Sequence, residues 1–224
     1  MRRALFVVPL VLLAGCGGRE DDARQSGPPA GALVRAAAVG DAAEVRRLLA
    51  AGADVDERTA TGRTAVTAAA LGDHVDVARA LIDAGARVDL QDDERNNPLL
   101  VCGETGSVAM LREVLRGHPD LTRTNRFGGT ALIPASDRGH VAMVRALLET
   151  DIDVDHVNNL GWTALIEAVI LGEGGPPHRA IVRALVGAGA DVNLPDRDGV
   201  TPLQHARQRG YAEIVRTLET AAAR

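Results

Sequence analysis

Aromatic residues are nearly absent from this chain of 224 residues, because phenylalanine, tryptophan and tyrosine together make up only 2% of it. Alanine, leucine, valine and glycine are abundant instead, so the core has to be assembled from small aliphatic side chains. Such side chains favour thin helices that pack closely together. Lysine is missing, since all 25 basic residues are arginine. This excludes a Schiff-base lysine and a phosphate-binding lysine.

Positive charge is also scarce relative to negative charge. The chain has 25 basic and 30 acidic residues, which gives a formal net charge of −5 at pH 7. Nucleic acids are bound through basic surfaces that displace counterions, so the sequence predicts that no nucleic acid is a partner. The content of 46% hydrophobic and 25% charged residues is typical of an ordinary folded domain.

The first fifteen residues have the pattern of a segment that is removed during processing. Residues 1–3 (Met-Arg-Arg) form a positive start, residues 4–12 are apolar, and residues 13–16 read Leu-Ala-Gly-Cys. The apolar run is too short for a permanent membrane-spanning helix. The segment resembles the signal peptide of bacterial lipoproteins, which is cut before a cysteine that carries lipid. An ordinary secretory signal with an incidental Cys16 is the alternative.

This resemblance implies a location. It implies a signal peptide over residues 1–15, a lipid on Cys16, and a protein that is anchored in the bacterial cell envelope and faces the periplasm. Residues 16–30 contain glycine, proline and charge with few apolar side chains, so we expect a flexible tether. In enteric bacteria an aspartate after the lipidated cysteine resembles an inner-membrane retention signal. Gly17 stands there instead, which favours the outer membrane.

An internal repeat dominates the rest of the chain. A threonine or asparagine followed by alanine or proline recurs at positions 64, 97, 130, 163 and 201. We call these five positions the repeat marks. The first four repeat marks are 33 residues apart, and the interval between the last two contains a five-residue insertion. One period before Thr64, an earlier repeat is predicted to start at Gly31. The repeats lie near residues 31–63, 64–96, 97–129, 130–162, 163–200 and 201–224.

The pattern of residues within each repeat predicts a helix, a turn, a second helix and a loop. The threonine can cap the first helix, and a proline behind it suits the first helical turn. A glycine such as Gly139 can end that helix in a left-handed conformation. The second helix carries an apolar stripe, for example Met143, Val144, Leu147 and Leu148. No repeat can bury its stripe alone, so we expect an all-α stack that neighbouring repeats stabilise.

The repeated motifs resemble those of the ankyrin repeat family over residues 31–224. They include residues 199–203 (Gly-Val-Thr-Pro-Leu), 139–140 (Gly-His) and 189–193 (Gly-Ala-Asp-Val-Asn). The resemblance implies a curved α-solenoid of six repeats with β-hairpin-like finger loops along one edge. It also implies a monomeric protein-binding module that is not an enzyme and needs no cofactor.

Candidate catalytic and metal-binding residues are few. His74, His140 and His178 occupy the same repeat position, which is typical of structural hydrogen bonding at a turn. The remaining histidines have no partners at zinc-site spacing. Cys102 stands where the repeat needs a small buried residue, so we interpret it as a core thiol and not as a nucleophile. We predict no catalytic residue and no metal site.

The resemblance places the partner-binding surface on the finger loops and on the concave face that the first helices form. Phe127 and Trp162 fall on adjacent fingers, and aromatic side chains ringed by polar ones are typical of interface hot spots. Packing of both rings onto neighbouring helices is the alternative. The predicted partner-binding residues are Asp93, Glu94, Arg126, Phe127, Arg138, Asn159, Leu160, Trp162, Ile170 and Leu171.

Three functions are compatible with these patterns. The leading hypothesis is a membrane-anchored periplasmic module for protein–protein interaction. One alternative is a periplasmic immunity or inhibitor protein that neutralises a toxic effector enzyme. Another is a scaffold that supports an envelope or stress-response enzyme. The identity of the partner would decide among them.

Overall fold

The computed structural model describes residues 28–223, and the predicted signal peptide, Cys16 and most of the predicted tether lie outside the described residues. Over the described part, the chain forms twelve helices in six consecutive pairs. They are α1 (Ala32–Ala38), α2 (Ala42–Ala50), α3 (Ala65–Leu71), α4 (Val75–Asp83), α5 (Pro98–Thr105), α6 (Val108–Arg116), α7 (Leu132–Asp137), α8 (Val141–Leu147), α9 (Ala164–Ile170), α10 (Pro176–Gly187), α11 (Pro202–Gln208) and α12 (Ala212–Ala222).

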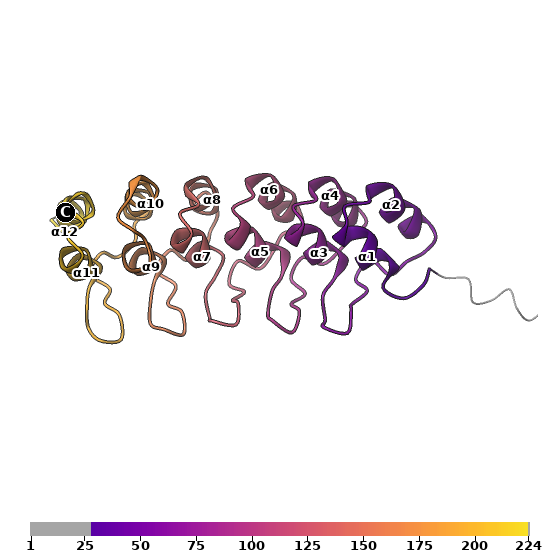
Figure 1. The fold of residues 1–224 in the computed structure, drawn as a ribbon, viewed down its shortest axis with the longest axis horizontal. Helices are drawn as coiled ribbons and strands as arrows, with labels where there is room; N and C mark the ends of the chain where they lie inside the picture. Colours follow the sequence, from indigo (N-terminus) through magenta and orange to yellow (C-terminus); the bar gives the residue numbers. More distant parts are fainter. Residues whose placement is uncertain (1–27, 224) are drawn as a thin grey trace, which may run out of the picture.

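The six helix pairs stand side by side in one row (Figure 1). Each odd-numbered helix packs against the next odd-numbered one, and the even-numbered helices form a second layer in the same way. The loops between pairs project from the side of the odd-numbered helices (Figure 1). No strand forms within residues 28–223, where an isolated bridge joins Arg58 and Thr64. The predicted all-α solenoid of helix-turn-helix repeats is confirmed.

The core is a continuous aliphatic layer between the two rows of helices. The helices α3, α5, α7 and α9 are buried along most of their length, and all six residues from Ala65 to Ala70 in α3 are buried. The even-numbered helices bury one stripe, and in α8 it consists of Met143, Val144 and Leu147, with Leu148 partly buried behind them. This matches the predicted stripe. Because each pair covers the next, burial of this apolar surface stabilises the row as a unit.

Four side chains, each from a different repeat, form a hydrogen bond to the backbone near the turn between the two helices of the preceding repeat. Tyr211 occupies the position equivalent to the three histidines, and its hydroxyl donates to the carbonyl oxygen of Gly172 at 3.0 Å. The ring of Tyr211 also packs over Gly174, where a Cβ would clash with it. The histidine Nε2 atoms lie 3.2 Å from Ala38 O for His74, 3.0 Å from Glu104 O for His140 and 2.8 Å from Asp137 O for His178. The interpretation of these histidines as structural is therefore confirmed.

The fourth repeat begins differently from what the sequence predicts. Thr130 should cap the first helix as Thr64 does, yet α7 begins behind Ala131 and no side chain caps it. In the other repeats the carbonyl of the capping residue accepts from the N–H four residues later, but that residue here is Pro134, which has no N–H. The Thr130 carbonyl accepts from Ile133 at 3.2 Å instead. The Thr130 hydroxyl is left buried without a partner among the described residues.

Gly103 marks the closest approach between two neighbouring repeats. It lies within α5 and is fully enclosed, and a Cβ at this position would clash with the carbonyl oxygen of Ala131 at the start of α7. Glycine usually weakens a helix interior, so this residue is explained by the close packing of α5 on α7.

Gly103→Ala should lower the free energy of unfolding by about 1 to 3 kcal/mol, because overpacking outweighs the gain in helix propensity. Chemical denaturation of the purified protein measures this change. The matched control is Gly187→Ala, at the exposed end of α10 with no neighbouring atom in the way. It should raise the free energy of unfolding by about 0.5 to 1 kcal/mol. Equal effects of the two variants would contradict this account of Gly103.

Candidate functional site

Each of the last four finger loops folds around a buried aspartate or asparagine. In the finger before α9, Asn158 Oδ1 accepts from the backbone N–H groups of Leu160 at 2.9 Å and Trp162 at 3.0 Å. Buried acceptors of this kind replace the strand partners that a hairpin would provide. The equivalent acceptors are Asp92, Asn125 and Asp196. Sequence analysis missed them, although an acidic or amide residue recurs five positions before the last four repeat marks.

Neighbouring fingers are also joined to each other. The backbone N–H of Asn159 donates to the Phe127 carbonyl at 2.9 Å, and that of Asp93 donates to the Thr61 carbonyl at 3.0 Å. Arg126 forms an ion pair with Glu94 of the preceding finger. Its guanidinium carbon also lies 4.9 Å from the centroid of the Phe127 ring, within cation–π distance. The fingers thus present their tips in a fixed row.

A groove lies between the fingers that precede α7 and α9 and the ends of the first helices. We call it the finger groove, and its volume is about 160 Å³. Its lining residues are Glu104, Asn125, Phe127, Gly129, Ile133, Pro134, Asp137, Arg138, Asn158, Leu160, Glu167 and Leu171. A smaller hollow of about 120 Å³ adjoins it and is lined by Glu94, Asn96, Glu104, Asn125, Arg126 and Phe127.

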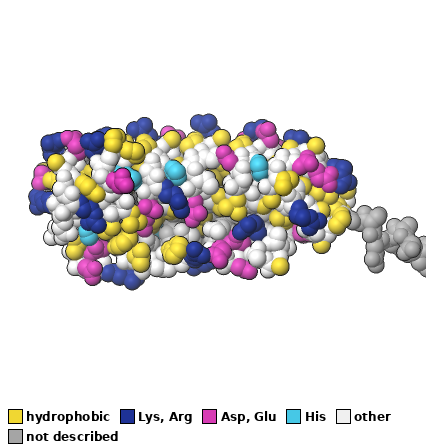
Figure 2. Space-filling model, in the orientation of Figure 1, with side chains coloured by type: hydrophobic (Ala, Val, Ile, Leu, Met, Phe, Trp, Pro, Cys, Tyr) yellow, Lys and Arg dark blue, Asp and Glu magenta, His cyan; other side chains and the backbone are white. Residues whose placement is uncertain are grey.

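Three large apolar side chains lie exposed around the finger groove. Phe127 is 55% exposed, Leu160 is 52% exposed and Leu171 is 47% exposed. Arginine and acidic side chains are scattered over the stack, with hydrophobic side chains between them (Figure 2). An apolar cluster rimmed by polar residues is typical of a surface that binds another protein.

Some of the predicted partner-binding residues meet at this site and others do not. Phe127, Arg138, Leu160 and Leu171 line the finger groove, and Glu94 and Arg126 line the adjoining hollow. Neither hollow is lined by Asp93, Asn159, Trp162 or Ile170. Trp162 and Ile170 are half-buried, so the expected aromatic pair is replaced at the groove by Phe127 with two leucines. The partner-binding role of all ten residues stays a prediction.

Glu167 is a further charged residue that the sequence analysis missed. It lies in α9, is only 7% exposed, and accepts a hydrogen bond of 2.7 Å at Oε1 from Asn158 Nδ2. Burial, together with the nearby Asp137 carboxylate, raises the pKa of Glu167 to about 7. In the next repeat the same two positions hold His205 and Asp196, with 2.6 Å between Nε2 and Oδ2. The sequence feature that could have identified Glu167 is its place four residues after Thr163, because the first helices of the repeats from Thr64 onward are buried at this position.

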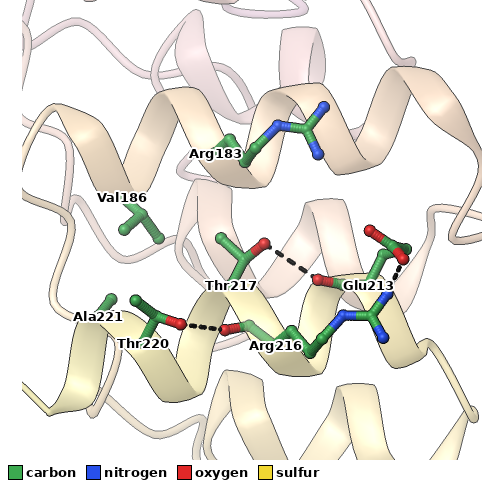
Figure 3. A pocket seen from close by; sticks show the side chains of 7 residues that line it. All are labelled: Arg183, Val186, Glu213, Arg216, Thr217, Thr220 and Ala221. Carbon is green, nitrogen blue, oxygen red and sulfur yellow. Dashed lines mark hydrogen bonds and ion pairs between the residues drawn. The ribbon is translucent and has the colours of Figure 1, made fainter.

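A larger hollow of about 390 Å³ lies between α10 and α12 (Figure 3). Several of its polar groups are already paired: Arg216 pairs with Glu213, and the Thr217 hydroxyl donates to the Glu213 carbonyl at 3.0 Å. The Thr220 hydroxyl donates to the Arg216 carbonyl at 2.8 Å. The lining contains no buried charge and none of the predicted partner-binding residues. The finger groove is therefore the better candidate site.

Cys102 shows no sign of reactivity. It is fully buried in α5, and burial raises the pKa of its thiol to about 12, so the thiol stays protonated at neutral pH. Within residues 28–223, no group of three or more histidine, cysteine, aspartate or glutamate side chains is arranged to hold a metal ion. None of the helices in that part of the chain has the length and apolar character needed to cross a membrane.

Comparison with known proteins gives a consistent result. The family model for ankyrin repeats (three copies) matches residues 33–125 and again residues 104–196. The ankyrin repeat protein YahD of Escherichia coli (strain K12) is 42% identical over 189 residues, which are 84% of this chain and 94% of that protein. An ankyrin repeat domain from Acinetobacter baumannii AYE is 47% identical with a TM-score of 0.83, covering 86% of this chain and 98% of that one. The ankyrin repeat domain of Bcl-3, from the IκB protein family, is 29% identical with a TM-score of 0.76, covering 85% of each chain.

Glu167→Gln should remove a pH dependence of stability. The pKa of this carboxyl rises from its ordinary value of 4.5 to about 7 on folding, so the folded protein binds the proton more tightly. This stabilisation is complete below pH 4.5 and is lost as the pH rises through 7. Between these limits, the parent protein should lose about 1 to 3 kcal/mol of unfolding free energy relative to the variant.

Chemical denaturation of both proteins at a series of pH values measures the difference. All other titrating groups are shared by the two proteins, and the variant keeps the Oε1 acceptor for Asn158. Parallel stability curves from pH 4.5 to about 8 would contradict the assignment of a raised pKa to Glu167.

Proposed function

The chain belongs to the ankyrin repeat family, and we propose that it binds a partner protein with the finger groove. Ankyrin repeats act as protein–protein interaction modules, and the stack described above is such a module. The observation that supports this groove as the binding site is the exposure of Phe127, Leu160 and Leu171 around one small hollow. Burying such side chains against a partner contributes about 25 cal/mol per Å² of apolar surface.

The construction of the fingers supports this proposal. Asn125 and Asn158 fix the two loops that carry Phe127 and Leu160, and the hydrogen bond from Asn159 to Phe127 joins the loops. A surface that is already ordered loses little conformational entropy when a partner binds. The apolar side chains of the groove are therefore held ready for contact.

We further propose that this module works at the periplasmic face of the bacterial envelope, and most readily at the outer membrane. The pattern of residues 13–16 and the glycine at position 17 support this location. The two alternative roles use the same groove: an inhibitor would cover the active site of a toxic enzyme, and a scaffold would hold an envelope enzyme in place. An assay of the captured partner with and without this protein separates them, because only an inhibitor abolishes the partner's activity.

Cys16→Ser should abolish lipid attachment and move the protein from the membrane fraction to the soluble fraction of the cell envelope. Metabolic labelling with a fatty acid, followed by fractionation, measures both effects. Cys102→Ser serves as the matched control, because its thiol is buried in the stack. Labelling that persists in the Cys16→Ser variant would contradict the proposed anchor.

The double variant Phe127→Ser/Leu160→Ser should weaken partner binding by about tenfold or more, because each side chain contributes on the order of 1 kcal/mol when buried. The parent protein is used to capture a partner from envelope extract, and the affinity for the purified partner is then measured. Val39→Ser is the matched control, because Val39 is 75% exposed and lies at the end of α1, away from the groove.

The control should bind as the parent does, and the double variant should keep its thermal stability. Equal affinity of the parent and the double variant would place the binding site elsewhere on the stack. Failure of the parent protein to capture any partner would count against the binding function itself.

A further inference from the structure

Glu167 is a buried carboxylate that the repeat architecture does not require. At the equivalent position the other repeats have Arg35, Ala68, Val101, Pro134 and His205, none of which is acidic. Burying a carboxylate costs free energy unless it is paired. Among the described residues, only Asn158 donates a hydrogen bond to Glu167, and this bond is to Oε1. The second oxygen, Oε2, therefore remains available in the lining of the finger groove.

The finger groove carries more negative than positive charge. The carboxylates of Glu104, Asp137 and Glu167 line it together with a single guanidinium, that of Arg138. Within residues 28–223, none of these three carboxylates forms an ion pair, whereas Glu44 in α2 and Glu113 in α6 are both paired with arginine. An occupant of the groove would therefore gain most from a positive charge.

The size and the rim of the groove fit one long side chain. Its volume of about 160 Å³ is below the range of roughly 300 to 1,000 Å³ that is usual for small-molecule sites. Phe127, Leu160 and Leu171 are apolar, as a partner for an aliphatic stem should be. Arg126 lies over the ring of Phe127, which demonstrates that this ring packs against a guanidinium group.

We propose that the finger groove takes one cationic side chain, arginine or lysine, from the partner protein, with Glu167 as its ion-pair partner. The aliphatic stem of that side chain packs among Phe127, Leu160 and Leu171. This inference rests on the proposed function and adds to it the chemistry of the partner's anchor residue.

A random-peptide library displayed on phage and selected against the purified protein tests the inference, because the selection does not require the partner itself. Peptides that bind the parent and lose affinity for the Phe127→Ser variant occupy the groove. These peptides should carry an arginine or lysine at one fixed position beside apolar residues. The tightest peptide is then synthesised in two forms, with the cationic residue and with a neutral isostere, citrulline for arginine or norleucine for lysine.

The affinities of both peptides for the parent and for Glu167→Gln, measured at about pH 8, above the pKa of about 7 of Glu167, form a double-mutant cycle. Removal of the peptide charge, or of the Glu167 charge, should each weaken binding by about tenfold or more, and the two effects together should be no larger than either alone. Because the glutamine keeps the acceptor for Asn158, a purely structural role of Glu167 would not produce this coupling. Glu44→Gln, which removes an exposed carboxylate from α2, should leave both affinities unchanged.

Two results overturn the inference and leave the proposed function standing: groove-binding peptides without a conserved cation, and cationic peptides whose affinity does not depend on the Glu167 charge. A selection that returns no peptide sensitive to Phe127→Ser overturns both the inference and the groove as the binding site.

Discussion

The contact between one helix pair and the next is the interaction on which every other feature depends. A single pair leaves its apolar stripe exposed, and the next pair covers it with a face of the same shape. The helices must therefore approach closely, which explains the small residues of α3 and the glycine at position 103, where even a methyl group would meet a neighbouring carbonyl. The scarcity of aromatic residues is a consequence, because large rings do not fit between thin helices.

The same stacking fixes the positions of the fingers. Once the helices are in register, the loops between pairs emerge at regular intervals, and the buried side chains of Asn125 and Asn158 determine how each loop turns. Contacts between adjacent fingers then reinforce the row. Positions in the helices serve packing, so the freedom to evolve a binding specificity is concentrated at the finger tips and at the rim of the groove.

The repeating features of this protein could be predicted from its sequence, and the exceptions could not. Helix pairs and the buried stripe of α8 follow from positions that recur along the repeats, and the structural histidines follow from a position that three repeats share. The cap at Thr130 failed because one proline removes one N–H, an effect that a repeat average conceals. Phe127 and Leu160 were predicted as finger residues, with packing of Phe127 left as an alternative, whereas Glu167 was not recognised. Its position holds a different residue in every repeat, and its role depends on Asn158 across the loop.

The repeat of α9 and α10 carries a five-residue insertion, which lengthens both the turn between these helices and the start of α10, and a tyrosine holds this turn in place of a histidine. The phenol reaches the Gly172 carbonyl while its ring lies against Gly174, a residue of the inserted segment with a positive φ of 65°. The insertion and Tyr211 are thus a matched pair in adjacent repeats. We therefore expect the insertion and the tyrosine to occur together in related chains. A related chain with the shorter turn could carry histidine at the position of Tyr211.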